Sequence, residues 1–344
     1  MKKFFGSIRF VLHTMSNESR LVLMLAFASI MVAFVITTIY QGNTFFASTP
    51  ESKSKIVVIL KSVDYKNLAF WESIKDGVEV ASKDFGVDLT ITGPQSETQI
   101  DEQIRIIQEA IRSKPDAIIL AAADYTRLVP IAREIKENHI PLVLIDSFIN
   151  GDDADSKIGT NNYEAGQKAG SALMNYIQPG GEVIIMSYVQ GSSTAIDRES
   201  GVRNYLKGKC EISQTLYSSG ESEIAYKQAK KLISENPQLK GIITLNDPTT
   251  IGAAQALDES GKKTDIVLIG FDKSVKVLGY VEAGVVRDTI VQKPFNMGYL
   301  GIKTALDLVQ GKKVDKFIDT GSIVINRQNM LLPENQKLLF PINR

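Results

Sequence analysis

The chain has few of the residues that form disulfides or metal centres, and it has no net charge. Its single cysteine, Cys210, cannot form an internal disulfide and lies too far from the N-terminus to carry a lipid anchor there. Two histidines, His13 and His139, give no metal-ligand constellation. The 39 basic and 39 acidic residues leave a formal net charge of zero, so no electrostatic attraction to nucleic acid is expected. We therefore expect no metal, no cofactor and no nucleic-acid partner.

The most prominent feature that is present is an uncharged apolar run over residues 21–40, LVLMLAFASIMVAFVITTIY. At roughly 1.5 Å rise per residue, a helix of this length spans about 30 Å of hydrocarbon. Four cations and one acid, Glu18, precede the run, and the next cation is Lys53, a bias that favours a cytoplasmic N-terminus. The sequence predicts a cytoplasmic stub at 1–20, a single-pass membrane anchor at 21–40, a polar tether at 41–54 and an extracytoplasmic domain beyond it.

Two other interpretations fit the apolar run less well. A cleaved signal peptide has a shorter apolar core, roughly 7–15 residues, and ends in a small-x-small cleavage site. The exit of this run reads YQGNTFFA, in which only Ala47 is small at a useful position. A core helix of a globular domain normally shows a polar face, and this run has none. These features favour an uncleaved anchor.

After the tether, strand-like and helix-like patterns alternate. Runs such as KIVVIL at 55–60 are typical of strands covered on both faces, whereas Phe70, Ile74 and Val78 lie on one helical stripe. Further strands are predicted at 87–92, 117–121, 141–145, 182–187, 211–216, 240–245 and 265–270, with one more ending at Val291. The predicted helices are 70–85, 99–113, 128–138, 162–177, 195–207, 222–235, 248–260 and 294–310. This alternation predicts an α/β fold with parallel sheets, and around ten strands favour two sheets over one.

Polar and aromatic side chains gather in the loops that follow these strands. They are Asp64, Asn67, Phe70, Trp71, Asp146, Gln190, Ser192, Ser193, Asp197, Arg198, Asn246, Asp247, Asp272 and Gln292. In open parallel sheets, ligands bind beyond the carboxyl ends of the strands. Flat aromatic rings cover the apolar faces of a sugar, while amides, carboxylates and guanidinium groups match its neighbouring hydroxyls. This mixture predicts a sugar site.

Each of these residues also has a purely structural interpretation. Phe70 and Trp71 are candidates for the core of the first helix, because adjacent positions on a helix face different ways. Asp146, Asn246 and Asp272 are of the types that cap helices. Arg198 has acidic neighbours in sequence with which it could pair on a solvated face.

An enzymatic role is not expected. The chain contains no Gly-x-Ser-x-Gly elbow, no Walker A loop and no His-Glu-x-x-His pattern. Asp146 and Asp272 could form an acid–base pair, but the amides beside them are typical of a binding site. A DNA-binding regulator is not indicated either, because a membrane span stands where a helix-turn-helix would precede the domain.

Eight stretches resemble the ribose/galactose-type (class I) periplasmic binding proteins, which share their fold with the effector domains of LacI-type repressors. In order they are FWESIKDG (70–77), KPDAIILAAAD (114–124), IPLVLID (140–146), IGTNNYEAGQKAG (158–170), TAIDRESGVRNYL (194–206), ITLNDPTTIGAAQAL (243–257), IGFDKS (269–274) and DTIVQKPFNMGYLGIKTAL (288–306). Together they cover nearly the whole chain outside the apolar run, in the order of the family.

The resemblance implies two doubly wound parallel-sheet lobes joined by a hinge. The N-terminal lobe would comprise 55–159 and 293–320, and the C-terminal lobe 160–292 and 321–344. The implied ligand contacts are Asn67, Phe70, Trp71, Asp146, Arg198, Asn246, Asp272 and Gln292. The aromatic rings would sandwich the sugar, and the polar groups would take its hydroxyls. Ser147 stands where ribose-type members often have arginine, and the loop before Phe70 is longer by a residue, so the sugar stays open between pentoses such as xylose or ribose and hexoses.

Two roles in different classes fit this resemblance. One is an anchored sensor that presents its sugar-dependent shape to a membrane partner such as a sensor histidine kinase. The other is the substrate receptor of an ABC-type sugar importer, which would meet an ABC permease. A membrane anchor with a short tether raises the local concentration near one membrane partner, which favours the sensor. The cytoplasmic stub of about 20 residues is too small for an output domain of its own.

Overall fold

The computed structural model describes residues 16–45, 53–66 and 68–340, in two compact units divided at Ser52 and Lys53. In the first unit, α2 runs from Asn17 to Phe45, and its segment Asn17–Thr38 is long and apolar enough to cross a membrane. The hydroxyl groups of Ser29, Thr37 and Thr38 donate to backbone carbonyls within the helix. Ser29, for example, donates to the carbonyl of Leu25 at 2.8 Å. The helix extends beyond the predicted 21–40, so the predicted tether is helical over 41–45.

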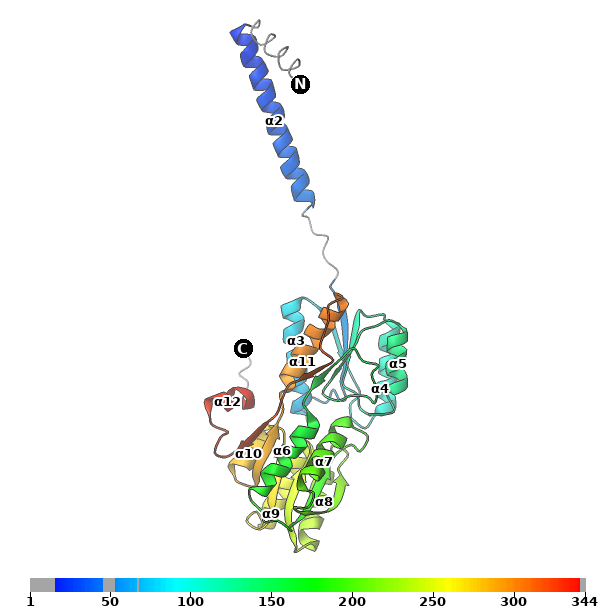
Figure 1. Cartoon of the computed structure of the whole chain (residues 1–344), viewed down its shortest axis with the longest axis vertical. Helices are drawn as coiled ribbons and strands as arrows, with labels where there is room; N and C mark the ends of the chain where they lie inside the picture. The colour runs from blue at the N-terminus through cyan, green and yellow to red at the C-terminus, as the bar shows by residue number, and fades with distance from the viewer. Residues whose placement is uncertain (1–15, 46–52, 67, 341–344) are drawn as a thin grey trace. The chain divides into compact units, whose positions relative to one another are not determined.

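The second unit contains two six-stranded sheets (Figure 1). The first has the order β11-β5-β4-β3-β1-β2 and the second the order β12-β10-β9-β8-β6-β7. All pairings are parallel except that of β12 with β10. The first sheet consists of β1 (Lys55–Ile59), β2 (Asp88–Thr92), β3 (Ala117–Leu120), β4 (Leu142–Ile145), β5 (Ser156–Gly159) and β11 (Phe317–Asp319). The second consists of β6 (Glu182–Ser187), β7 (Glu211–Tyr217), β8 (Leu239–Thr244), β9 (Val267–Phe271), β10 (Val286–Val291) and β12 (Ile323–Asn326). The predicted α/β fold with two parallel sheets is confirmed.

Helices cover both faces of the first sheet. On one face α3 (Ala69–Phe85) and α11 (Pro294–Val309) lie side by side, and on the other lie α4 (Ile100–Arg112) and α5 (Val129–Glu137) (Figure 1). The side chains of β1 alternate between the two cores. Ile56 and Val58 pack under α3 and α11, whereas Val57 and Ile59 pack under α4 and α5. Burial on both faces explains the uninterrupted apolar run in this strand.

The second sheet is covered in the same way. α6 (Asn162–Met174) and α7 (Ser193–Leu206) lie on one face. The other face carries α8 (Ser222–Glu235), α9 (Asp247–Ser260), α10 (Val275–Glu282) and α12 (Pro333–Leu339). We call the first sheet with its helices the first lobe, and the second sheet with its helices the second lobe.

The chain passes between the lobes three times. It crosses after β5, returns after β10 and crosses again between β11 and β12. Each lobe is therefore assembled from segments that are distant in the sequence. Five short elements were not predicted: β5, β11, β12, α10 and α12. β11 has three residues and is largely exposed at a sheet edge, so it lacks the apolar run that identified the central strands.

A polar cavity between the two lobes

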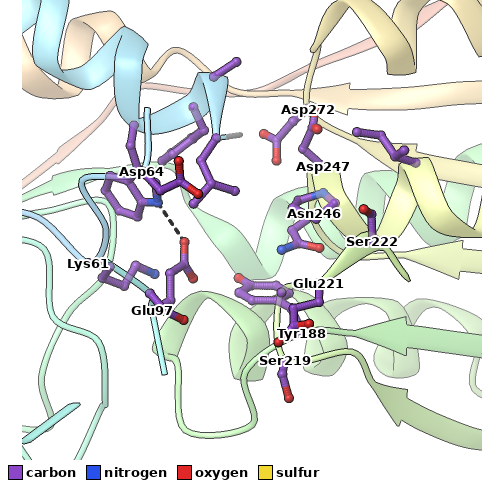
Figure 2. Close-up of a pocket in the computed structure, with 18 of the residues that line it drawn as sticks. Lys61, Asp64, Glu97, Tyr188, Ser219, Glu221, Ser222, Asn246, Asp247 and Asp272 are labelled. Atoms are coloured by element: carbon purple, nitrogen blue, oxygen red, sulfur yellow. Dashed lines mark hydrogen bonds between the residues drawn. The ribbon is translucent and has the colours of Figure 1, made fainter. Parts of the chain in front are cut away.

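A cavity of about 490 Å³ lies where strand ends of the two sheets face each other. Seven of the eight predicted contacts line it, namely Phe70, Trp71, Asp146, Arg198, Asn246, Asp272 and Gln292. The eighth, Asn67, lies outside the described residues. In Figure 2, Lys61 and Glu97 lie on one wall, and Asn246, Asp247 and Asp272 lie on the wall opposite. The cavity has the size and mixed lining of a small-molecule site.

The aromatic wall comes from the first turn of α3. Trp71 is only 2% exposed and belongs to the core of the first lobe, yet it also lines the cavity. Phe70 meets it edge to face at 5.2 Å between ring centroids. The indole Nε1 donates to Oε1 of Glu97 at 2.8 Å. Trp71 is thus both a core residue and a cavity residue, because its apolar body packs inward while its polar atom reaches the cavity side.

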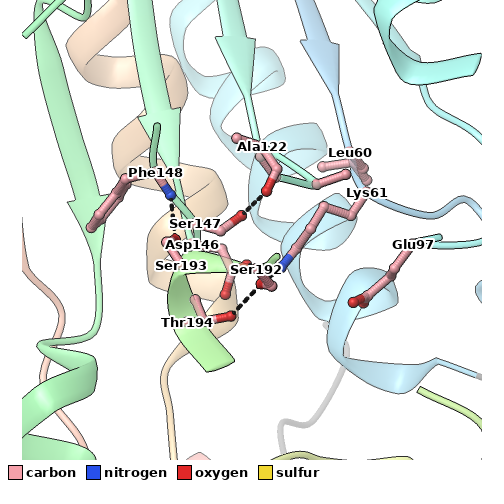
Figure 3. A network of polar contacts seen from close by, with 12 residues as sticks. Leu60, Lys61, Glu97, Ala122, Asp146, Ser147, Phe148, Ser192, Ser193 and Thr194 are labelled. Carbon is pink, nitrogen blue, oxygen red and sulfur yellow. Dashed lines mark hydrogen bonds and ion pairs between the residues drawn. The ribbon is translucent and has the colours of Figure 1, made fainter. Parts of the chain in front are cut away.

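A buried ion pair lies on the floor of the first lobe. Lys61 Nζ is 3.1 Å from Oδ2 of Asp146, and it also donates to Ser192 Oγ of the second lobe at 3.3 Å (Figure 3). Burial lowers the pKa of Lys61, but the attraction of Asp146 and Glu97 outweighs it, and the net shift of the pKa is upward. Lys61 therefore stays protonated beside the cavity. Lys61 directly follows the predicted strand 55–60. It could therefore have been found by the rule that ligands bind beyond the carboxyl ends of the strands, which we call the strand-end rule.

Asp146 and Asp272 occupy equivalent places after β4 and β9. Both have left-handed backbones, with φ of 60° and 70°. Aspartate tolerates this region better than most residues, and the conformation turns the chain sharply at the strand end. Neither is the N-cap of a helix, so the capping alternative is wrong for both. Asn246 does cap α9, accepting from Thr249 N at 3.1 Å, and it also lines the cavity.

Arg198 does not lie on a solvated face. It is 2% exposed, its guanidinium is 4.6 Å from the ring centroid of Phe271, Nε donates to Asn162 Oδ1 at 2.8 Å, and a terminal nitrogen donates to the Leu245 carbonyl at 2.7 Å. Glu199 pairs instead with Arg203. The predicted alternative of a surface ion pair is therefore wrong.

Two glycines place Arg198 by letting α6 and α7 cross closely. A Cβ on Gly166 would lie 2.1 Å from the carbonyl oxygen of Arg198, and one on Gly201 would lie 2.1 Å from that of Tyr163. Neither contact is possible for a larger residue without moving a backbone. The close crossing brings Asn162 of α6 within reach of the guanidinium.

The second lobe also contributes linked carboxyl and amide groups. Gln292 Nε2 donates to Asp272 Oδ1 at 2.7 Å, and both side chains are buried. Burial raises the pKa of Asp272, although Arg198 and Gln292 act in the opposite direction. Burial and the charge of Asp272 raise the pKa of Asp247 to about 7. Among the described residues, Gln292 Oε1 is buried without a hydrogen-bond partner.

The prediction from the sequence did not include several residues that line the cavity. Besides Lys61 these include Glu97, Tyr188 and Thr194. Tyr188 directly follows β6 and the strand-end rule applies to it, but Glu97 lies well inside the loop after β2 and carries no local signal. Over residues 16–45, 53–66 and 68–340, no group of three His, Cys, Asp or Glu side chains could hold a metal ion.

Comparison with known proteins identifies the family. A model of the periplasmic binding protein domain matches residues 56–313, most of the chain. The chain belongs to the periplasmic binding protein family. The class I, ribose/galactose-type resemblance indicated by the motifs is thereby confirmed. The ribose import binding protein of Bacillus subtilis is 25% identical over 257 residues, 75% of this chain and 83% of that protein. The D-ribose/D-allose-binding protein of Pseudomonas aeruginosa is 27% identical over 275 residues, 77% and 85%.

Solved structures are similar over the same region. A solute binding protein of a carbohydrate transporter from Agrobacterium radiobacter, in complex with D-arabinose, has a TM-score of 0.81 and 28% identity, covering 84% of this chain and 99% of that one. A solute binding protein of an ABC transporter from Agrobacterium vitis, with bound D-fucose, has a TM-score of 0.80 and 34% identity, covering 83% and 100%. Both matches cover most of this chain and leave a minority of its residues unmatched.

Proposed function

We propose that the chain is an extracytoplasmic receptor that binds one monosaccharide in the cavity between its lobes. The observation that carries this proposal is the convergence of Arg198, Asp272 and Gln292 from one lobe with Asp146 and its ion-pair partner from the other. These groups are buried and largely pre-organised. A ligand rich in hydroxyls would complete them, and one of its hydroxyls could donate to Gln292 Oε1, which has no partner among the described residues.

The proposed ligand is a neutral pentose, such as xylose or ribose, or a hexose. The names of the relatives support a monosaccharide, since they include ribose, allose, D-arabinose and D-fucose. The aromatic wall of Phe70 and Trp71 supplies the apolar surface that a sugar ring needs. Ser147, which replaces the arginine frequent in ribose-type members, is occupied by its own bond to the Ala122 carbonyl at 2.8 Å.

We further propose that the sugar closes the two lobes around it. Both lobes line the cavity, so a ligand that touches both stabilises the conformer in which they are close. The three connections between the lobes provide the hinge. The closed shape is then what a membrane partner recognises.

Two membrane partners fit such a shape. The names of the relatives, which are import binding proteins and transporter components, support delivery of the sugar to an ABC permease. The second candidate is signalling to a sensor histidine kinase, and α2 is the observation that favours it. An apolar helix of this length, if retained, would hold the receptor beside one membrane partner.

A fluorescence titration tests the binding proposal. Trp71 is the only tryptophan and lines the cavity, so its emission in the full-length, detergent-solubilised protein should change saturably with the correct member of a monosaccharide panel. The same sugar at about 100 times its dissociation constant should stabilise the fold by roughly 2.7 kcal/mol. The variant Arg198→Ala should show neither effect. A panel of pentoses and hexoses that changes neither emission nor stability of the unmodified protein would refute the proposal.

Deletion of the gene distinguishes the two partners. An import receptor predicts that uptake of the identified sugar falls while transcriptional responses to internal sugar persist. A sensor predicts that sugar-dependent transcription is lost while uptake through a constitutively expressed permease is unchanged.

A further inference from the structure

Glu97 is held at the cavity by a fixed loop. It lies between β2 and α4, and the chain around it is tied to the connection that follows β1. Val63 N donates to the Pro94 carbonyl at 2.9 Å, and Ser62 Oγ donates to the Gln95 carbonyl at 2.8 Å. The loop that carries Glu97 is therefore held by hydrogen bonds to the segment that directly follows Lys61.

The loop is also closed on itself. Gln99 Oε1 accepts from the backbone N–H groups of Gln95 and Ser96, at 3.0 Å each. These bonds satisfy two backbone donors in the middle of the loop and tie them to the residue that precedes α4. A glutamate on such a loop has a defined direction, unlike one on a free surface loop.

Glu97 contacts Trp71 and lies near Lys61, two residues that line the first-lobe side of the cavity (Figure 2). Its Oε1 accepts the only polar hydrogen of the Trp71 side chain at 2.8 Å. Lys61 Nζ is 5.5 Å from the centroid of the same indole ring, and its charge is attracted by Glu97 as well as by Asp146. Figure 2 shows Glu97 beside Lys61 on this wall.

The orientation of the indole depends on this bond. Trp71 packs its body in the core against apolar neighbours, which restrain its position but offer its N–H nothing to bind. An indole N–H that is buried without an acceptor is unfavourable. The Glu97 carboxylate supplies the acceptor and thereby selects one orientation of the ring edge toward the cavity.

We propose that Glu97 is a positioning residue for sugar binding, which orients the Trp71 ring at the cavity. This inference rests on the proposed function. Glu97 acts through Trp71, so the affinity for sugar depends on its hydrogen-bond acceptor first and on its charge second.

Three variants of the full-length protein test this role. Glu97→Ala removes the acceptor and the charge, Glu97→Gln keeps an acceptor oxygen without the charge, and Glu72→Ala removes an exposed acid of α3 next to Trp71 as the matched control. Urea denaturation identifies any variant that has lost its fold. The first readout is the emission maximum of Trp71 and its quenching by acrylamide without sugar. The second is the dissociation constant for the sugar that the unmodified protein binds.

The expected result is graded. Glu97→Ala should shift the sugar-free emission, increase quenching and weaken sugar binding by about tenfold or more. Glu97→Gln should restore the emission and recover most of the affinity, and Glu72→Ala should match the unmodified protein in both readouts. Sugar-free emission that is unchanged in Glu97→Ala, with or without a loss of affinity, overturns the positioning role. An affinity in Glu97→Ala within a factor of about three of the unmodified value also overturns it. A lack of response to every sugar in the unmodified protein defeats the proposed function itself, and is distinguishable because it appears before any variant is made.

Discussion

Lys61 and Asp146 form an ion pair in which Nζ and Oδ2 are 3.1 Å apart and the side chains are only 3% and 4% exposed. Two charges so deeply buried require each other, because either one alone would keep the full cost of leaving water. The pair reaches the second lobe through Ser192, which links to Thr194 at 2.9 Å (Figure 3). The ion pair on the floor of the first lobe is thus connected to the second lobe by the hydrogen bond from Lys61 to Ser192.

Loss of Lys61 should therefore destabilise the protein and remove sugar binding. We expect Lys61→Met to lower the free energy of unfolding by about 3 kcal/mol, because Asp146 is left as a buried charge without its partner. Urea denaturation at pH 7 measures the change. Lys75→Met is the control, since its pair with Glu79 is partly exposed and should contribute less than about 1 kcal/mol. Equal stability of the two variants would show that Asp146 tolerates the loss of Lys61 without the expected cost. Adding Asp146→Asn to Lys61→Met should recover part of the loss.

Arg198→Lys should abolish most sugar binding although it keeps the positive charge. A lysine ammonium cannot stack on Phe271 while donating to both Asn162 and the Leu245 carbonyl. We expect the dissociation constant, measured by calorimetry, to rise by about 100-fold or more. Arg203→Lys on the exposed face of the same helix should leave it unchanged. An affinity of Arg198→Lys within a factor of about three of the original would remove Arg198 from the site.

A hydrogen bond between the two lobes should affect the affinity for sugar, although the residues that form it do not line the cavity. Ser193 Oγ of α7 accepts from the backbone N–H of Phe148 at 2.8 Å, and neither residue lines the cavity. Removing a bond worth about 1 kcal/mol shifts the equilibrium toward conformers with the lobes further apart.

We expect Ser193→Ala to weaken sugar binding about fivefold and to increase the radius of gyration of the sugar-free protein in small-angle scattering. Ser213→Ala, at an exposed position of β7, should change neither quantity. If both quantities stay constant in Ser193→Ala, this bond does not hold the lobes together.

The stability of the protein should fall as the pH rises toward 7 because of Asp247. Its pKa is raised from 3.8 to about 7 by burial and by Asp272. Between these two values the folded state binds more protons than the unfolded state, so the free energy of unfolding decreases with increasing pH. Asp247→Asn removes this dependence while keeping an acceptor for Ser274 N.

The variant should match the unmodified protein near pH 4 and be more stable above pH 7 by on the order of 2 kcal/mol, a value reduced from the full shift because the carboxylate keeps some contact with solvent. Urea midpoints at the two pH values give the comparison. A difference between the two proteins that does not vary with pH would contradict the assignment.

The apolar helix should remain attached to the mature protein. We expect N-terminal sequencing of the protein from the membrane fraction to begin at or near Met1, because the exit of the helix offers no convincing cleavage site. Alkaline carbonate washing should leave the protein in the membranes. Mature protein that starts near Ser48 in the medium would show that the helix is a signal peptide.

Much of the fold was determined by the sequence alone. Strands buried on both faces must be apolar throughout, so runs such as 55–60 were visible without a structure, and their alternation with amphipathic helices required parallel sheets. The positions after the strands gave a longer list of polar and aromatic candidates, because ligands of open parallel sheets bind beyond the carboxyl ends of the strands. The family resemblance selected eight of those candidates, and the seven that the structure describes, including Asp146 and Asp272, line one cavity.

The tertiary structure alone decided how those residues are used. Arg198 could have paired with a neighbour four or fewer positions away, but the close crossing of α6 and α7 buries it against partners 36 and 47 positions away. Glu97 reaches Trp71 across 26 positions through a loop with no pattern of its own. Local sequence carries information on periodicity and turns, whereas these contacts depend on where separate segments come to lie after the sheets have formed. The energy of a buried polar group depends on such distant partners, so its role is set by packing and not by its place in the chain.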